Sequence, residues 1–165
     1  MASRLSIQEA LKQSMLAKDE LRTGTLRMLL AAVSNKEKEK RYKVSKAEPT
    51  LLEQELQAKS ALSPEELQDT VSSEVKKRRE AIEGFEKGGR KEQAEKEKQE
   101  MEILLFYLPA QLSEDEIRVL VKDAISKAEA AGPQDLGKVM GVLAPQTKGK
   151  ADGNLVSKIV KELLS

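Results

Sequence analysis

An all-α fold is predicted by three features of this 165-residue sequence. Aromatic residues make up only 2% of the chain, fewer than a β-sandwich or β-barrel normally uses. Charged residues make up 35%, and the composition is dominated by good helix formers, namely Ala, Leu, Glu, Lys and Gln. Apolar residues recur at spacings of three and four, and no segment alternates between apolar and polar residues.

The first half of the chain is expected to hold helices near residues 6–18, 19–42 and 64–87. Ser6-Ile7-Gln8-Glu9 has the pattern of a capping box at a helix start. Ser63-Pro64-Glu65-Glu66 repeats this pattern, with proline at a first helical position where its missing N–H has no cost. Residues 43–62 have no clear assignment, although the spacing of their leucines allows a short extra helix after Pro49.

The predicted helix at 64–87 has one apolar face with a single charged member. The face contains Leu67, Val71, Val75, Arg78, Ile82 and Phe85. We expect the stem of Arg78 to pack at the edge of this face while its charged head stays in solvent.

The second half is expected to hold helices near residues 90–107, 113–131, 135–143 and 153–164. They are separated by helix-breaking stretches at Gly88-Gly89, Pro109, Gly132-Pro133, and from Ala144-Pro145 to Gly153. Asp152 is expected to cap the last helix. One face of that helix is apolar and contains Leu155, Val156, Ile159, Val160 and Leu163.

A domain boundary is expected at Tyr107-Leu108-Pro109. It would separate an extended helical N-terminal domain, residues 1–107, from a compact three-helix domain, residues 108–165. So small a unit is marginally stable alone, so we expect it to pack against, or be tethered to, the N-terminal part.

The run KEKEKRYK at residues 36–43 has two interpretations. It is either a basic anchor for a partner or a solvated helix end in which Glu37 pairs with Arg41. The solvated helix end is favoured, because charge runs on helices usually face solvent.

The composition excludes several kinds of chemistry. The chain has no cysteine and no histidine, so disulfides, thiolate metal sites and the commonest general base are absent. Glu114-Asp115-Glu116 is better explained as first-turn acids that complement a helix dipole than as a metal site. Lys148-Gly149-Lys150 is not a Walker phosphate loop, which would need glycine in place of Ala144 and a hydroxyl residue in place of Ala151. We therefore predict no enzyme activity, no metal and no cofactor.

The N-terminal residues and the hydropathy bear on location. No stretch is long and apolar enough to span a membrane, and the first 15 residues have no apolar signal core. We expect a cytoplasmic protein, or a mitochondrial one if a targeting peptide has been removed.

The C-terminal segment is locally basic, although the whole chain has a net charge of only +1. Residues 136–165 contain five lysines and two acidic residues. Within this segment the turn TKGKADG, residues 147–153, places two glycines and two lysines before the last helix.

This segment resembles the tail domain of GatB, the tRNA-binding subunit of the glutamyl/aspartyl-tRNA amidotransferases. The shared elements are Gly137-Lys138-Val139-Met140 and the run Lys148-Gly149-Lys150-Ala151-Asp152-Gly153-Asn154-Leu155-Val156. With TLRMLLAAVSNKEKEK, EVKKRREAIEGFEKGGR and AEKEKQEMEILLFYLPAQLSEDEI, the chain is similar to the YqeY family from about residue 5 to its end. Residues 43–62 look longer than the usual link of that family.

The resemblance implies an all-helical fold and a tRNA-related role without amidotransferase chemistry. We therefore expect a non-catalytic accessory protein that touches tRNA or another structured RNA. The candidate RNA-binding residues are Lys138, Lys148, Gly149, Lys150, Gly153 and Lys158. Glycine permits close approach of a phosphate, and lysine supplies charge. The alternative is that the turn only reverses the chain, and that the protein is a helical adaptor binding a protein partner on its N-terminal helices.

Overall fold

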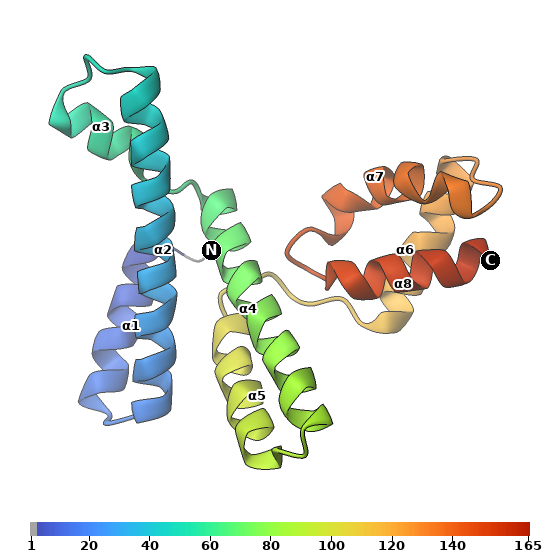
Figure 1. Ribbon diagram of the computed structural model, residues 1–165, viewed down its shortest axis with the longest axis horizontal. Coiled ribbons are helices and arrows are strands. Elements are labelled where there is room, and N and C mark those ends of the chain that lie inside the picture. The colour runs from blue at the N-terminus through green and yellow to red at the C-terminus, as the bar shows by residue number, and fades with distance from the viewer. Residues whose placement is uncertain (1–2) are drawn as a thin grey trace. The chain divides into compact units, whose positions relative to one another are not determined.

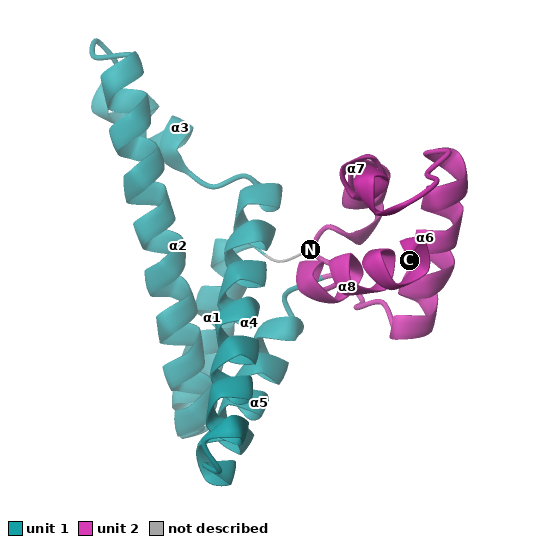
Figure 2. Cartoon of the chain, turned by 45° about the vertical axis from the view of Figure 1, so that its right-hand side comes forward, with its two compact units in different colours: residues 1–108 teal, residues 109–165 magenta. Residues whose placement is uncertain are grey.

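The computed structural model describes residues 3–165, which contain eight α-helices, one short 3₁₀ helix and no β-strand. The prediction of an all-α fold is therefore confirmed. The chain divides into two compact units, residues 1–108 (unit 1) and residues 109–165 (unit 2), shown in Figure 2. Within the described part of the chain, no helix combines the length and the apolar character needed to cross a bilayer.

Unit 1 is built from two helix pairs and one short helix. Its elements are α1 (Arg4–Leu16), α2 (Glu20–Ala47), α3 (Glu53–Ser60), α4 (Pro64–Lys87) and α5 (Lys91–Leu105). Helix α1 packs along α2, and α4 packs along α5 (Figure 1). Helix α2 also contacts α3, α4 and α5, so it connects the two pairs.

The core of unit 1 combines apolar residues from α1, α2, α4 and α5. Its buried members are Ile7, Leu26, Leu29, Val33, Leu67, Val71, Val75, Leu104 and Tyr107. Leu67, Val71 and Val75 of the apolar face predicted on residues 67–85 therefore lie in this core, and Ile82 is also buried. Burial of this face, rather than the helix propensity of its residues, provides most of the stability of such helices.

Two helix boundaries in unit 1 differ from the prediction. Helix α1 begins at Arg4 because Ser3, not Ser6, is the N-cap. The two serines cap each other, since Ser6 N donates to Ser3 Oγ at 3.1 Å and Ser3 N donates to Ser6 Oγ at 3.0 Å. Helix α2 continues to Ala47, past the expected end at residue 42, because no glycine or proline interrupts it before Pro49.

The guanidinium of Arg78 does not lie in solvent as expected. The Arg78 side chain is only 12% exposed, and its Nε lies 2.9 Å from Glu100 Oε2 and 3.2 Å from Glu97 Oε2. Both glutamates belong to α5, so the pattern within α4 alone gave no sign of them. Arg78 therefore joins α4 to α5 by a largely buried ion pair.

Glu37 and Arg41 were expected to pair with each other, but they do not. Glu37 pairs with Arg4 of α1, and Arg41 pairs with Glu53 of α3 at 2.7 Å. Each side chain has found an opposite charge on another helix, which an argument from i,i+4 spacing does not consider.

Unit 2 consists of three mutually contacting helices (Figure 1). They are α6 (Glu114–Lys127), α7 (Leu136–Thr147) and α8 (Gly153–Leu164), and the 3₁₀ helix η1 (Pro133–Asp135) leads into α7. The buried core contains Ile117, Val121, Ala124, Val139, Leu143, Val156, Ile159, Val160 and Leu164. Unit 2 thus has a core of its own.

Two helix ends in unit 2 differ from the prediction. Helix α6 stops at Lys127 rather than near 131, and Glu129 takes a φ of 49° just beyond its end. Helix α7 runs through Pro145 to Thr147. Proline removes the hydrogen bond to the carbonyl four residues earlier, and that residue, Gly141, is exposed, so water can satisfy its carbonyl.

Candidate nucleic-acid interface

Residues 147–150 form a type II β-turn between α7 and α8. Lys148 has φ −56° and ψ 120°, Gly149 has φ 70°, and Lys150 N donates to Thr147 O at 2.9 Å. The third residue of a type II turn needs a positive φ, which glycine adopts without steric cost. Gly149 is therefore required by the turn itself.

The turn is fastened to the segment that precedes α6. The amide of Gln111 donates one hydrogen bond to Gly149 O at 2.8 Å and another to Pro109 O at 2.9 Å. Leu112 N donates to Lys150 O at 2.7 Å. The carbonyl groups of Gly149 and Lys150 are thus occupied within unit 2, while the side chains of Lys148 and Lys150 are exposed.

The N-terminus of α8 follows directly. Asp152 caps it as expected, because its Oδ1 accepts hydrogen bonds from Asn154 N at 2.8 Å and Leu155 N at 3.0 Å. Two of the N–H groups that an anion would use are therefore taken by the cap. Gly153 is the first helical residue, and a Cβ placed on it would meet nothing within 4 Å. Unlike Gly149, Gly153 is not required by the backbone conformation.

The remaining candidate lysines lie at different distances from the turn. Lys158 is exposed on α8, about 8 Å along the helix axis from Gly153. Lys138 lies at the opposite end of α7, about 15 Å from Lys148 along the axis. Its Nζ contacts Asp135 Oδ1 at 2.7 Å, and this hydrogen bond holds the pKa of the Asp135 carboxyl below its ordinary value. Lys148, Gly149, Lys150 and Gly153 are thus brought together, and Lys138 is not.

The basic character belongs to α7 and α8 rather than to unit 2 as a whole. Unit 2 contains eight Lys/Arg and eight Asp/Glu residues, because α6 begins with three acids. Glu116 accepts hydrogen bonds from Ser113 N at 2.7 Å and Ser113 Oγ at 2.8 Å. These bonds hold the pKa of the Glu116 carboxyl below its ordinary value. One of the first-turn acids of α6, Glu116, thus also takes part in capping the helix.

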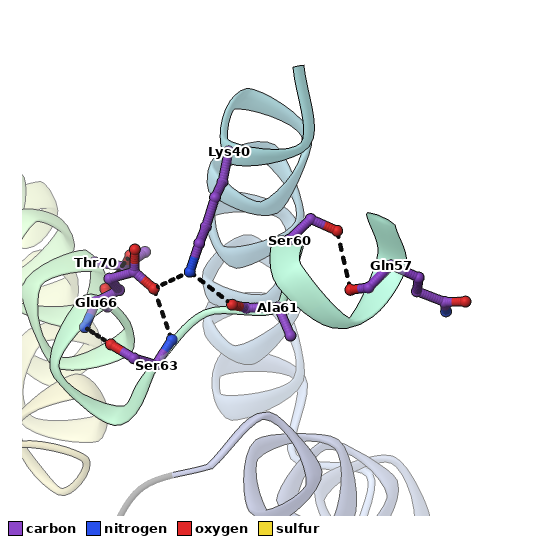
Figure 3. A network of polar contacts seen from close by, with 7 residues as sticks. All are labelled: Lys40, Gln57, Ser60, Ala61, Ser63, Glu66 and Thr70. Carbon is purple, nitrogen blue, oxygen red and sulfur yellow. Dashed lines mark hydrogen bonds and ion pairs between the residues drawn. The ribbon is translucent and has the colours of Figure 1, made fainter. Parts of the chain in front are cut away.

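Unit 1 contains a groove between α2 and α4 that is lined by both apolar and charged residues. Its volume is about 830 Å³. The α2 wall includes Lys36, Glu39, Lys40 and Lys43, and the α4 wall includes Glu66, Asp69, Glu74 and Lys77. At one end Lys40 Nζ bridges Glu66 Oε2 at 2.6 Å and Ala61 O at 2.9 Å (Figure 3). Among residues 3–165, no cluster of three or more His, Cys, Asp and Glu side chains is placed to hold a metal ion.

A comparison with protein families matches this chain to the Yqey-like proteins over residues 4–55 and 44–164. The chain belongs to the YqeY family. The two matches overlap at residues 44–55, within the segment 43–62 that looked longer than the usual family link.

Three fungal relatives carry the name "Altered inheritance of mitochondria protein 41, mitochondrial". The chain is 36% identical to the Eremothecium gossypii protein over 63% of this chain and 48% of that relative. It is 31% identical to the Lachancea thermotolerans protein over 78% and 60% of the two chains. For the Pyrenophora tritici-repentis protein the identity is 28% over 96% and 78%. This YqeY chain thus spans about half the length of the first relative.

A shorter match supports the relationship to the amidotransferases. The chain is 38% identical over 55 residues to a protein of Methanobrevibacter smithii that is named as a component of a glutamyl-tRNA(Gln) amidotransferase. The match covers 31% of this chain and 9% of that relative. It accords with the resemblance between the YqeY and GatB proteins.

Gln111 is the residue of this region that sequence reasoning missed. It lies 38 residues before Gly149, and nothing in its local pattern indicates which backbone group it would bind. Lys161 was also missed as a candidate, although it is exposed on α8 one turn after Lys158. The three-residue spacing of these two lysines was the available signal.

Proposed function

We propose that this YqeY protein is a non-catalytic accessory protein that associates with tRNA or another structured RNA through unit 2. The contact centres on the turn at residues 147–150 and on the start of α8. Lys148 and Lys150 contact phosphate oxygens, Gly153 allows the backbone to approach closely, and Lys158 extends the contact along α8. Lys138, at the far end of α7, serves a separate phosphate.

The observation that carries the proposal is the construction of the turn. Its carbonyl oxygens are occupied by Gln111 and Leu112, so no acceptor of Gly149 or Lys150 needs to face an approaching anion. The two lysine side chains extend from a backbone fixed by a type II turn and by these bonds. Asp152, the nearest carboxylate in sequence, is engaged by two backbone N–H groups, which reduces its repulsion of a phosphate.

The glycine at position 153 adds support. Glycine is unfavourable within helices compared with alanine, and neither a positive φ nor a steric contact demands it here. A residue that the fold does not need is consistent with close approach of a ligand backbone.

The name of one relative supports an association with tRNA. The Methanobrevibacter relative is named for glutamyl-tRNA(Gln), and we extend the tRNA association to this chain as a proposal. The names of the three fungal relatives contain the word mitochondrial. They favour the mitochondrial alternative for this protein, while the cytoplasmic location stays a prediction.

The residue types limit the mode of binding. Unit 2 contains no aromatic residue, so it has no platform on which unpaired bases would stack. Binding through unit 2 is therefore directed by phosphates and shape, and it weakens with salt.

The test is the affinity of the full chain for fluorescently labelled total tRNA, measured by anisotropy near physiological salt. We expect Lys148→Ala/Lys150→Ala to weaken binding at least tenfold. The control is Lys122→Ala/Lys127→Ala, which removes two exposed lysines from α6 of the same unit. Equal affinities for the two double variants would contradict a contact at the turn.

A helical adaptor remains the second candidate, and the groove between α2 and α4 favours it. The apolar faces of α4 and α5 are mostly buried inside unit 1, as at Val71, Val75 and Leu104. A partner would therefore occupy the groove between α2 and α4 instead. Loss of protein binding after groove substitutions, with tRNA binding absent in the wild type, would favour this candidate.

A further inference from the structure

The second half of α2 is a basic segment of unit 1. Residues 36–46 contain six Lys/Arg and two Glu residues. Both glutamates are engaged by cations, Glu37 by Arg4 and Glu39 by Lys36 at 2.9 Å. The Lys36 hydrogen bond holds the pKa of the Glu39 carboxyl below its ordinary value. Because these two carboxylates already pair with Arg4 and Lys36, the other Lys and Arg residues of the segment keep a net positive charge.

Two of the six cations hold neighbouring elements in place. Lys40 bonds Glu66 and Ala61 O, and so joins α2 to the segment between α3 and α4 (Figure 3). Arg41 makes a bidentate contact with Glu53 at 2.7 Å to each oxygen, which joins α2 to α3. These two contacts explain Lys40 and Arg41 as structural residues.

Lys38, Tyr42 and Lys46 are not explained in this way. They are spaced by four residues on α2, so they form one exposed row with about 6 Å between successive members. The Tyr42 side chain is 60% exposed. Lys46 Nζ lies over the Tyr42 ring, 4.7 Å from the centroid, in a cation–π contact that a base stacking on that face would displace. We call these three residues the α2 row.

An exposed aromatic ring between two lysines is the combination that non-specific single-strand binders use. The ring stacks on a base and the lysines contact the backbone phosphates on either side. A tyrosine with a purely structural role would stabilise the fold by packing against other side chains. Tyr42 instead leaves most of its surface in water. Lys46 also lies in the last turn of α2, where it complements the helix dipole, but this role does not involve the ring.

We propose that the α2 row is a second RNA contact, which takes an unpaired nucleotide by stacking its base on Tyr42. Lys38 and Lys46 hold the adjoining phosphates. The row supplies the aromatic platform that unit 2 lacks. The inference deepens the proposed function and rests on RNA being the ligand, but it uses residues of unit 1 only.

The test uses the full chain and two labelled probes, a 20-nucleotide oligouridine and a 20-base-pair RNA duplex. Anisotropy is recorded at several KCl concentrations for the wild type, Tyr42→Ala, Tyr42→Phe and Lys38→Ala/Lys46→Ala. Phe106→Ala removes another exposed aromatic of unit 1 and is the control for the ring. Lys76→Ala/Lys87→Ala removes two exposed lysines of α4 and is the control for the charge.

We expect Tyr42→Ala to weaken oligouridine binding about tenfold with an unchanged salt slope. Tyr42→Phe keeps the ring and should bind oligouridine as tightly as the wild type. The affinity of Tyr42→Ala for the duplex should equal that of the wild type, because paired bases offer no free face. Lys38→Ala/Lys46→Ala should lower the salt slope, and both controls should match the wild type. Binding of oligouridine by Tyr42→Ala as tightly as by the wild type would overturn the inference.

The inference and the proposed function fail in different ways. If Lys148→Ala/Lys150→Ala loses tRNA while Tyr42→Ala keeps oligouridine, the turn is supported and the α2 row is overturned. The reverse result supports the α2 row and overturns the turn. Absence of binding to any probe by the wild type overturns both, and a protein partner then becomes the explanation for the α2 row.

Discussion

The side-chain amide of Gln111 donates a hydrogen bond to the backbone carbonyl of Gly149 at 2.8 Å, across 38 residues of sequence. The same amide also bonds Pro109 O, so one side chain joins the entry of unit 2 to the turn before its last helix. The turn is therefore part of the tertiary structure of unit 2 rather than a loose connection. Its geometry leads to the first two predictions.

Substitution of Gln111 by alanine should loosen the turn. The variant loses two hydrogen bonds to half-buried carbonyl groups, and a net loss of about 1 kcal/mol in the stability of unit 2 is expected. Hydrogen exchange should show faster exchange at the Leu112 amide, which donates to Lys150 O. The control is Gln146→Ala, because the Gln146 side chain donates to Val142 O within its own helix. If the Leu112 amide of Gln111→Ala exchanges as slowly as in the wild type, Gln111 does not anchor the turn.

Gly149, inside the basic turn, and Gly153, after it, should respond differently to alanine. Gly149→Ala forces a side chain into a backbone with φ 70° and should cost about 1 kcal/mol of stability. Gly153→Ala adds a Cβ in open space and should be neutral or slightly stabilising. Thermal unfolding of the two variants measures the difference. If Gly153 admits a phosphate, Gly153→Ala should also bind tRNA more weakly, although its fold is intact.

The ion pair of Arg78 should matter more than exposed pairs on the same helix. Arg78→Ala leaves Glu100, whose side chain is only 8% exposed, without its cation, and should destabilise unit 1 by about 3 kcal/mol. Lys76→Ala breaks an exposed pair with Glu80 and should cost under about 1 kcal/mol. The double variant Arg78→Met/Glu100→Met should recover much of the loss. Urea unfolding gives the free energy of unfolding of all three variants. Equal losses of stability for Arg78→Ala and Lys76→Ala would show that the Arg78 pair contributes no more than an exposed pair.

Acid should weaken the contact between α2 and α4. The Lys40 hydrogen bond, with the N–H of Ser63, lowers the pKa of the Glu66 carboxyl below its ordinary value of 4.5. Because the folded-state pKa is the lower one, the contribution is complete above about pH 5 and is lost as the pH falls through the folded-state pKa. Glu66→Gln should therefore flatten the fall in stability below pH 5.

The matched control for that measurement is Glu65→Gln, which removes the neighbouring first-turn carboxylate of α4. Thermal unfolding between pH 3 and pH 7 compares the two variants with the wild type. Identical pH profiles for Glu66→Gln and Glu65→Gln would show that the network around Lys40 contributes no specific pH dependence.

The helices of this protein were predictable because their signals are local. Ser63 and Asp152 cap the helices that the sequence assigned to them, since a cap depends on residues within one turn. The last helix was expected at 153–164 and is found at Gly153–Leu164. Apolar spacing alone identified most of the buried faces.

The contacts between helices were not predictable from local patterns. Arg78 was expected in solvent and pairs with Glu97 and Glu100, because its partners lie on a different helix. Gln111 was not singled out for the same reason. At the candidate site the sequence indicated the glycines and lysines of the turn, but only the backbone angles separate Gly149, which the turn requires, from Gly153, which it does not.

The most direct measurement is the salt dependence of tRNA binding by the wild type and by Lys148→Ala/Lys150→Ala. Each phosphate contact contributes a slope of about −0.7 to −0.9 in a plot of log affinity against log salt. If the turn meets phosphate, the double variant should bind more weakly and its slope should be shallower by about 1.5. Equal affinity and equal slope in the two proteins would show that the turn only reverses the chain between α7 and α8.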